Sequence, residues 1–387
     1  MKILISARSY PTSKAPFSAF IGVLAEEMVR QGMEVAVIAP QSLTSCWKNR
    51  ISLCPQQFDV EVETSCGIKT ITVYRPYTLT FGQGRFFALS AAIDKFLIHR
   101  KLCQIGKVFD VVYAHFWWSA NNVIDYAKAK KLPLFVATGE DSINIDMHLS
   151  PDAIRDIKEY VSGVISVSTK NIEESIIHGL TDGKNCIMLP NAVNVNVFHK
   201  MDKVNIRNQM GISQDDFVIA FCGRFNHRKG VMRVSDAIKR IAQPDVKVIF
   251  IGSTVEGETS EPDCNGIIFK GRLAHEKIPL YLNCADVFIL PTLAEGCPNS
   301  IVEAMACGLP IISSNLPFNY DILNSNNSIL VDPLNIEEIV NAIIQLRDIP
   351  GLKQRMAESS SQICEELTIE KRVRAILDFI KSHINIL

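Results

Sequence analysis

Two glutamates, Glu295 and Glu303, carry the strongest chemical signal in the sequence. Seven residues separate them, and they lie where a loop is expected to turn into a short helix at 300–306. Glu303 sits in a mostly apolar stretch, where a carboxylate without a polar partner is costly. The amides at a helix start favour an anion or another polar ligand. The spacing therefore predicts a binding site without identifying its ligand.

A second candidate site is the basic loop GRFNHRKG at residues 223–230, which precedes a predicted helix. Its cations, Arg224, Arg228 and Lys229, stand at the helix end that disfavours positive charge. A bound phosphate would reverse that penalty, because Arg offers a fork of donors and Lys a point charge. The alternative for this loop is a solvated basic turn. The alternative for Glu303 is a buried side chain that only hydrogen-bonds to backbone. No GxxxxGK[ST] pattern marks a Walker loop.

Strand-like and helix-like segments alternate along the chain in two series. The first predicts strands at 2–6, 34–39, 60–63, 68–74, 108–115, 134–138 and 163–167. Its helices are expected at 18–31 and 86–105 and between the last three strands. The second predicts strands at 217–222, 246–251, 266–269, 287–290, 310–313 and 328–330. Its helices are expected at 231–241, 279–284, 300–306 and 336–348.

Short apolar strands that alternate with helices form parallel sheets covered on both faces. The two series therefore predict an α/β chain with two doubly wound, Rossmann-like domains that face a cleft. We expect domains at 1–199 and 200–370, and a C-terminal helix at 371–387 that packs back towards the first domain. Ligands of such sheets bind beyond the carboxyl ends of the strands, so the loops that follow the strands are where the chemistry is expected.

Composition excludes several classes of function. A formal net charge of −1 over 387 residues argues against nucleic acid as the main partner. The 11 cysteines show no CxxC spacing, which argues against a zinc site and favours a reducing compartment. No apolar run approaches the ~18 residues of a spanning helix, and the N-terminus lacks the apolar core of a signal peptide. A cytoplasmic protein is expected.

The motifs resemble those of the family 4 glycosyltransferases, which are retaining enzymes with the GT-B fold. The segment EGCPNSIVEAMACGLPII at 295–312 resembles their E-x7-E segment, and GRFNHRKG resembles their G-R-x4-K-G loop. The segment LPNAVNVNVF at 189–198 resembles P-N-G-V-D-x3-F, with Ala192 and Asn194 as departures. ISVS at 165–168 matches the preceding I-x-V-S strand. The matches keep the family order and span roughly residues 1–333.

The resemblance implies that the second domain binds a nucleotide-diphosphate sugar. Arg224 and Lys229 would hold the diphosphate, Glu303 the ribose hydroxyls and Glu295 the hydroxyls of the transferred sugar. The donor-binding set that the resemblance implies also includes Gly223, Arg272, Gly296, Cys297, Pro298 and Asn299. The family needs no metal, and no DxD pattern occurs here. Retention without an enzymic nucleophile implies same-face attack, in which the leaving phosphate helps to deprotonate the acceptor.

The first domain departs from the family pattern. SKAPF at 13–17 replaces a glycine pair after the first strand, so Pro16 and Phe17 are predicted acceptor contacts. TGED at 138–141 stands where the family has His-Gly-x-Asp, which puts Thr138 in place of the His and Glu140 beside it. Glu140 is predicted to bond a sugar hydroxyl or to act as a base. His115 ends a strand as a family His does, with a structural His as the alternative.

Two further features of the first domain suggest contacts with the acceptor. Trp117 belongs to an aromatic cluster that either stacks on a sugar or packs in the core. The predicted helix at 86–105 carries Lys95, Arg100 and Lys101 beside apolar residues. That pattern suits docking on a membrane surface near a lipid-linked acceptor, although a solvated helix face is the alternative.

The function predicted is transfer of a sugar from a nucleotide diphosphate to a glycan or lipid-linked acceptor, in cell-surface polysaccharide synthesis by family analogy. The predicted catalytic residues are Arg224, Lys229, Glu295, Glu140 and His115. One alternative is a nucleotide-sugar 2-epimerase, which would form product without an acceptor. Another is a non-catalytic nucleotide-sugar-binding protein, which would bind the donor without turnover. The sequence names neither the sugar, the base nor the acceptor.

Overall fold

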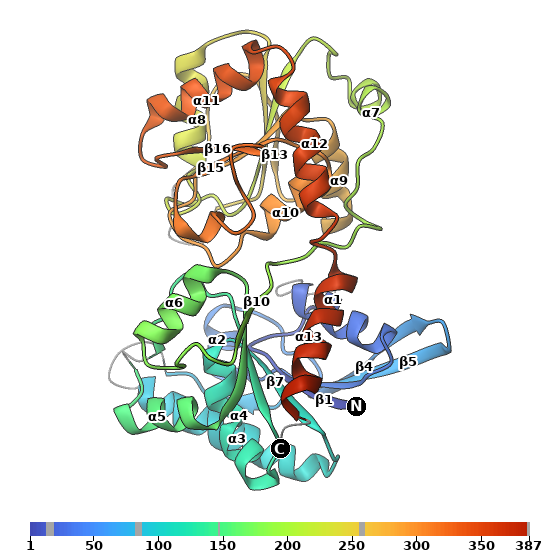
Figure 1. Cartoon of the computed structure of the whole chain (residues 1–387), viewed down its shortest axis with the longest axis vertical. Helices are drawn as coiled ribbons and strands as arrows, with labels where there is room; N and C mark the ends of the chain where they lie inside the picture. The colour runs from blue at the N-terminus through green and yellow to red at the C-terminus, as the bar shows by residue number, and fades with distance from the viewer. Residues whose placement is uncertain (13–18, 82–86, 146–147, 255–259, 385–387) are drawn as a thin grey trace. The chain divides into compact units, whose positions relative to one another are not determined.

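The computed structural model describes residues 1–12, 19–81, 87–145, 148–254 and 260–384. The chain divides into two compact units, which are drawn in Figure 1. Unit 1 comprises Met1–Leu189 and Arg372–Leu387, and unit 2 comprises Pro190–Lys371. The second unit thus begins before the expected residue 200, since the segment after Leu189 contacts unit 2, where Asn191 bonds the carbonyl of Cys297.

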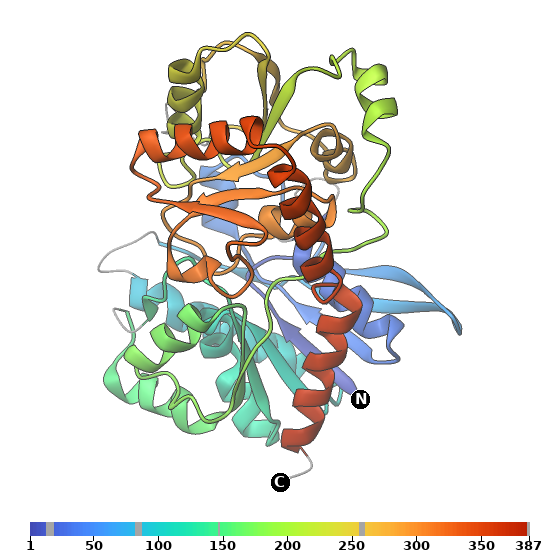
Figure 2. The same ribbon diagram turned by 45° about the horizontal axis from the view of Figure 1, so that its top comes forward.

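Within the described residues, unit 1 is built on an eight-stranded sheet of order β10-β9-β8-β7-β1-β2-β5-β4. Its strands are β1 (Lys2–Ser6), β2 (Glu34–Ile38), β4 (Gln57–Thr64), β5 (Gly67–Tyr74), β7 (Val111–His115), β8 (Leu134–Thr138), β9 (Val161–Ser166) and β10 (Cys186–Met188). All neighbours are parallel except β4 and β5, which form a hairpin that extends beyond the rest of the sheet (Figure 2). The strand order reverses at β1, which has β2 on one side and β7 on the other, and this is the switch point of the sheet.

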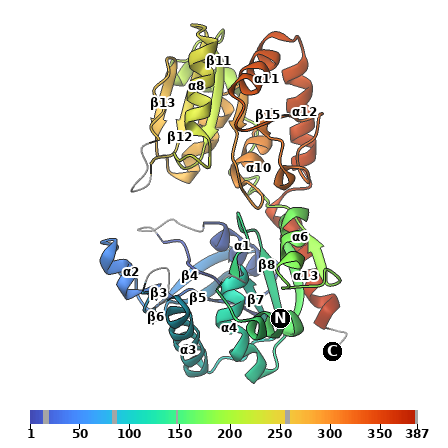
Figure 3. The same cartoon turned by 90° about the vertical axis from the view of Figure 1, so that its left-hand side faces the viewer.

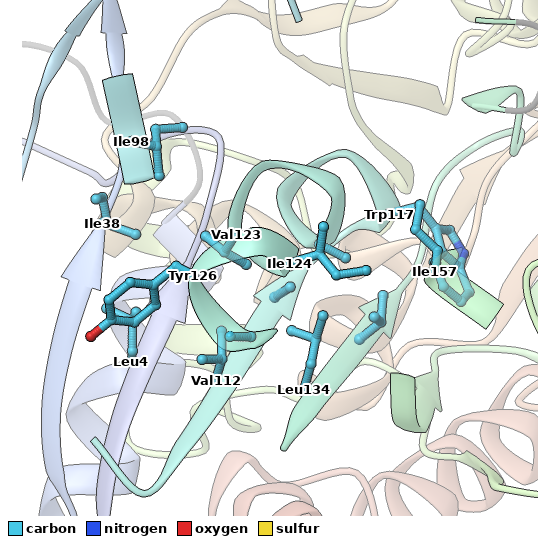
Figure 4. Packing of buried hydrophobic residues seen from close by; sticks show 14 of the residues in the cluster. Leu4, Ile38, Ile98, Val112, Trp117, Val123, Ile124, Tyr126, Leu134 and Ile157 are labelled. Carbon is cyan, nitrogen blue, oxygen red and sulfur yellow. The ribbon is translucent and has the colours of Figure 1, made fainter. Parts of the chain in front are cut away.

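Helices cover both faces of this sheet. Among the described residues, the helices of unit 1 are α1 (Ala19–Arg30), the short α2 (Leu43–Lys48), α3 (Phe87–Ile105), α4 (Trp117–Lys130), α5 (Pro151–Tyr160), α6 (Thr169–Ile177) and most of α13 (Ile369–Ile384). α3 and α4 pack together on one face (Figure 3), where Leu134 and Val136 join the buried cluster drawn in Figure 4. Since side chains alternate along a strand, Phe135 points to the other face. There its ring centroid lies 6.0 Å from that of Phe379 on α13.

Unit 2 has a six-stranded sheet of order β13-β12-β11-β14-β15-β16 among its described residues, and every neighbouring pair is parallel. The strands are β11 (Phe217–Cys222), β12 (Val246–Ile251), β13 (Ile267–Gly271), β14 (Val287–Leu290), β15 (Ile311–Ser314) and β16 (Ser328–Val331). The helices are α7 (Lys203–Met210), α8 (Val231–Ile241), α9 (Ile278–Asn283), α10 (Asn299–Ala306), α11 (Ile336–Asp348) and α12 (Leu352–Cys364), with short 3-10 turns η2 (His275–Lys277) and η3 (Pro317–Asn319). Here the strand order reverses between β11 and β14, so the loops after these two strands flank the switch point.

A buried charge cluster ties α7 to the sheet of unit 2. Asp286, just before β14, accepts hydrogen bonds from Arg207 at 2.7 Å and from the amide of Val218 at 2.8 Å. Lys203 and Lys353 each lie 2.7 Å from its other oxygen. Burial alone would raise the pKa of Asp286, but these cations lower it to about 2. Because Asp286 and Arg207 are both buried, each compensates a charge that would otherwise be costly.

Most predicted elements are confirmed, several to the residue. The strands at 2–6, 134–138, 217–222, 246–251 and 287–290 and the helices at 231–241 and 336–348 have the predicted bounds. Helices α6, α7 and α12 and strand β10 were not predicted. Nor was a small substructure made of α2 (Leu43–Lys48) and the short strands β3 (Gln41–Ser42) and β6 (Tyr77–Thr78). None of the helices in the described ranges combines the length and the hydrophobicity that a membrane span requires.

Candidate active site

The candidate active site of unit 2 is formed by the loops that follow β11 and β14. The basic loop 223–230 joins β11 to α8, and the segment 291–298 joins β14 to α10. Both loops leave the carboxyl ends of adjacent strands at the switch point, where ligands of doubly wound sheets bind. The topology therefore brings together two motifs that lie far apart in sequence, as the 67-residue separation of Arg228 and Glu295 shows.

Glu295 is the centre of this site. It is only 6% exposed, yet it carries two cationic partners. Arg228 donates to Oε1 at 2.9 Å, and the Lys229 ammonium forms an ion pair with the same oxygen. The hydroxyl of Thr292 donates to Oε1 at 2.8 Å. A buried carboxylate that is paired and hydrogen-bonded in this way is held in one orientation.

The backbones of the two loops approach each other closely at Gly230 and Pro291. Gly230 has a φ of +81°, and a Cβ at this position would lie 2.6 Å from the carbonyl oxygen of Pro291. The conformation and the contact both require glycine. Arg233, on the first turn of α8, donates to the carbonyls of His227 at 2.9 Å and Pro291 at 2.8 Å. This arginine therefore links both loops.

Arg224 differs from the other two cations of the loop. Its side chain is exposed, and the described residues offer its guanidinium no ion-pair or hydrogen-bond partner. Gly223 is fixed just before it, because its amide donates to the carbonyl of Ile251 at 2.9 Å. Arg224 is thus available to an anionic ligand, whereas Lys229 is already engaged by Glu295. Arg228 was not among the predicted site residues, although its position in the basic loop was a visible signal.

Glu303, on α10, meets a polar partner that the sequence analysis did not identify. Nε2 of His275 lies 3.1 Å from Oε1 of Glu303. The side chain of Glu303 is 15% exposed and that of His275 is 46% exposed. The hydrogen bond to Glu303 raises the pKa of His275 above its ordinary value. The cost of placing a carboxylate on an apolar helix is therefore offset by an imidazole from the segment after β13.

The start of α10 presents backbone groups close to Glu295. Gly296, Cys297 and Pro298 are buried, and Pro298 holds the N-cap position without a side-chain hydrogen bond to the helix. The carbonyl of Cys297 accepts a hydrogen bond from Asn191 at 2.7 Å, which fixes the turn into the helix. Asn299 is exposed as the first helical residue. A helix start without a side-chain cap favours a polar or anionic ligand.

Arg272 follows β13 in the same unit. Its side chain is exposed, and its Nε donates to the hydroxyl of Ser253, which follows β12. Arg272 therefore joins the loops after two neighbouring strands. Within the described residues, no hydrogen bond or ion pair joins Arg272 to the Glu295 or Glu303 side chain.

In unit 1, His115 ends β7 beside the switch point of the sheet. Its ring contacts those of Phe116 and Phe20, with centroids 4.1 and 4.8 Å away. Burial, together with the positive charge of Arg372, lowers the pKa of His115 to about 3. The imidazole is therefore neutral near pH 7 and can accept or donate one hydrogen bond.

Glu140 caps helix α4. Its Oε1 accepts from the amide of Trp117 at 3.0 Å, and its Oε2 accepts from the Thr138 hydroxyl at 2.7 Å and the Gly139 amide at 2.8 Å. The N-cap residue of α4, Phe116, makes no side-chain cap of its own. Burial raises the pKa of Glu140, while these hydrogen bonds oppose the shift. The carboxylate thus has a structural task that the sequence analysis did not foresee.

The remaining acceptor residues have different outcomes. Trp117 is 1% exposed, belongs to the core cluster and donates from its indole to Ser175, so its ring offers no face to a sugar. Its predicted role in acceptor binding is wrong for this reason, and the core alternative holds. Pro16 and Phe17 lie outside the described residues. Among the described residues, no group of three or more His, Cys, Asp or Glu is arranged to hold a metal ion.

Comparisons with known proteins agree with this geometry. Residues 202–362 match the family described as glycosyl transferases group 1. The chain is 26% identical over 355 residues to the putative teichuronic acid biosynthesis glycosyltransferase TuaC of Bacillus subtilis strain 168, a match that covers 89% of this chain and 88% of that protein. It is 29% identical over 209 residues to an Escherichia coli UDP-Gal:alpha-D-GlcNAc-diphosphoundecaprenol alpha-1,3-galactosyltransferase, covering 49% of this chain and 52% of that one.

The fold also matches solved structures along its whole length. Sucrose-phosphate synthase from Thermosynechococcus elongatus superposes with a TM-score of 0.79 at 16% identity, covering 100% of this chain and 99% of that one. HepE from Anabaena, solved in complex with UDP-glucose, has a TM-score of 0.71 at 19% identity, covering 99% and 100%. The fold is the GT-B fold. The chain is a glycosyltransferase of the hexosyltransferase type, which transfers a sugar from a nucleotide-sugar donor.

Proposed function

We propose that the chain is a retaining, family 4 type glycosyltransferase in which unit 2 binds the donor and unit 1 binds the acceptor. The observation that carries the donor assignment is the cluster of Arg228, Lys229 and Glu295 at the switch point of unit 2. Cations and a buried carboxylate meet there beside the exposed Arg224. A nucleotide-diphosphate sugar presents matching chemistry, because it carries a charged diphosphate next to a ring rich in hydroxyls.

The proposed donor contacts follow from these charges. Arg224 and Lys229, with Arg228 beside them, bind the diphosphate oxygens. Glu295 accepts hydrogen bonds from hydroxyls of the transferred sugar, and Glu303 accepts them from the ribose. In the structure Glu295 neutralises Lys229. Donor binding would therefore exchange an internal ion pair for a phosphate–lysine pair and a sugar–glutamate pair.

The proposed reaction breaks the bond between the anomeric carbon and the diphosphate oxygen. The acceptor hydroxyl forms the new bond on the same face of the sugar, and its proton passes to an oxygen of the leaving diphosphate. The loop cations stabilise the negative charge that develops on this leaving group, and stabilisation of developing charge is commonly a large part of catalysis. This chemistry needs no obligatory metal, since side-chain cations supply the neutralising charge. The neutral His115 is available to hydrogen-bond an acceptor hydroxyl from unit 1.

We propose a glycan or lipid-linked acceptor in cell-surface polysaccharide synthesis. Support comes from relatives named for teichuronic acid synthesis and for transfer to a diphosphoundecaprenol-linked sugar. A cytoplasmic location suits the cysteines, because all 11 are free thiols and reducing compartments keep them so.

Peripheral contact with a membrane surface is part of the same proposal. On α3, Phe96 is exposed, but Lys95 is paired with Asp125 at 2.9 Å, so this helix offers less free charge than the sequence suggested. Trp47 at the end of α2 is 85% exposed and is followed by the cation Lys48. An exposed Trp beside a cation suits a lipid headgroup region. Sedimentation with anionic vesicles, compared for the wild type and Trp47→Ala, tests the contact, and equal binding by both would count against Trp47.

Donor binding and turnover test the main proposal separately. A thermal-shift screen of nucleotide sugars should give stabilisation that Lys229→Ala removes, while Arg240→Ala near the end of α8 leaves it intact. Transfer to a glycan acceptor, followed by NMR of the product, should show the donor's anomeric configuration retained. Product formed without any acceptor would indicate a 2-epimerase. Tight binding without turnover on any acceptor would indicate a nucleotide-sugar-binding protein.

A further inference from the structure

The contact between His275 and Glu303 joins two segments that the fold, and not the local sequence, brings together. His275 opens the 3-10 turn η2 after β13, and Glu303 lies in the middle of α10. The two residues are 28 positions apart. A carboxylate only accepts hydrogen bonds when it is ionised, so the 3.1 Å contact requires the hydrogen on Nε2 of His275.

The imidazole is itself held in place. Its ring meets that of Phe198 edge to face, with centroids 5.0 Å apart and planes inclined by 64°. Phe198 is buried, and the carbonyl of His275 accepts the amide of Ile278 at the start of α9. A chain of contacts therefore runs from a buried ring through the imidazole to the carboxylate, and it restricts the rotation of the Glu303 side chain.

The charge of Glu303 acts on the last residue of β11. Burial raises the pKa of the Cys222 thiol to about 12, and the negative charge of Glu303 adds to the shift. Cys222 is the last residue of β11 and immediately precedes the basic loop. The carboxylate that His275 holds thus lies at the same end of the sheet as the loop that we assign to the diphosphate.

We propose that His275 is a positioning residue that selects ribonucleotide donors. Its Nε2–H occupies Oε1 of Glu303 and leaves Oε2 to accept hydrogen bonds from the vicinal hydroxyls of a ribose. The inference rests on the proposed function, since it takes Glu303 as the ribose-binding carboxylate. Its consequence is that His275 governs discrimination against a 2′-deoxyribose, although it touches neither the base nor the phosphates.

Binding of UDP, ADP and GDP, each compared with its 2′-deoxy counterpart by calorimetry, tests the proposal. The wild type should bind the preferred ribonucleotide about tenfold more tightly than the deoxy form, as one hydrogen bond allows. His275→Ala should weaken the ribonucleotide by about five- to tenfold, leave the deoxy form nearly unchanged and bring the ratio towards one. His275→Gln, whose amide nitrogen reaches about as far as Nε2, should restore the ratio, whereas His275→Asn should not. His199→Ala is the matched control, because this exposed histidine lies outside the pair.

Turnover gives a second readout that does not depend on the ratio. His275→Ala should raise KM for the donor and leave kcat within about threefold, since the residue does not touch the reacting atoms. Equal loss for both nucleotide forms, or an unchanged ratio, would overturn the positioning role.

Glu303→Gln distinguishes a failure of the His275 inference from a failure of the ribose assignment of Glu303. If Glu303→Gln abolishes discrimination between ribo- and deoxyribonucleotides while His275→Ala does not, only the positioning role of His275 fails. If Glu303→Gln leaves this discrimination intact, the ribose assignment of Glu303 fails. Circular dichroism of each variant shows whether it folds, and His275→Gln tests the proposal even where His275→Ala is unstable.

Discussion

Lys229 and Glu295 form an ion pair between loops that leave the adjacent strands β11 and β14. The pair is nearly buried, because the two side chains are 14% and 9% exposed. Each loop supplies what the other needs, because the buried lysine requires a counter-charge and the buried carboxylate requires hydrogen-bond donors. The two groups thus satisfy each other within the protein, and the proposed donor would supply new partners for both.

Lys229→Ala and Arg224→Ala should each reduce sugar transfer by at least ~100-fold, because each removes a cation that stabilises the leaving diphosphate. Steady-state kinetics with a saturating acceptor measures the loss. Arg240→Ala serves as the control, since this exposed arginine of α8 pairs with Glu337 away from the loop. Near-normal turnover in both site variants would contradict the diphosphate assignment.

Asp286→Ala should destabilise the protein by about 3–5 kcal/mol, because it leaves the buried Arg207 without its counter-charge. Urea unfolding followed by fluorescence measures the change in the free energy of unfolding. Asp263→Ala is a suitable control, since Asp263 pairs with Lys239 at an exposed site and its loss should change stability little. A small effect of Asp286→Ala would mean that the buried Arg207 does not depend on this carboxylate for its counter-charge.

Glu140→Gln should lower the thermal stability of the protein, because the amide brings a donor to a place where three donors already converge. A loss of about 1–3 kcal/mol is expected for an unsatisfied buried group. Thr138→Val, which removes only one of these donors, should cost less.

We also expect Glu140→Gln to cut transfer while donor affinity stays nearly intact. Normal stability with lost transfer would point to a catalytic carboxylate, and unchanged turnover would make Glu140 purely structural.

The fold was largely predictable because buried parallel strands have continuous apolar sequences. β8 and β14 stood out for this reason, and their bounds were predicted to the residue. The substructure of α2, β3 and β6 was not predictable in this way. A two-residue strand has no measurable periodicity, and a six-residue helix spans fewer than two turns.

The site was predictable only in part, because its contacts depend on the order of strands. The spacing of Glu295 and Glu303 in the sequence indicated a binding site, and the run of charges in the loop 223–230 indicated a second one. His275 carried no comparable signal, since its partner lies 28 residues away on another element. The capping role of Glu140 was hidden likewise, because the helix that it caps begins 23 residues earlier.

Transfer should persist in the presence of EDTA, because Arg224, Arg228 and Lys229 supply the charge that a metal ion supplies in other transferases. Initial rates with and without the chelator, after dialysis into metal-free buffer, measure this. A transferase known to depend on Mg²⁺ provides the positive control for chelation. Complete loss of activity that added Mg²⁺ or Mn²⁺ restores would contradict the metal-free mechanism.

The stability of the folded protein should fall as the pH drops from about 6.5 towards 3, and His115 should contribute to that fall. Its folded pKa is lowered to about 3, against about 6.5 in the unfolded chain. Between these values the unfolded state binds a proton that the folded state does not, so acid favours unfolding. Most carboxylates titrate below about pH 5, so the comparison is best made between pH 7 and pH 5. His115→Asn should lessen the decrease over that interval by up to ~2 kcal/mol, less any screening by solvent. Denaturant unfolding of both proteins at the two pH values measures the difference, and parallel pH profiles would show that His115 protonates freely in the folded state.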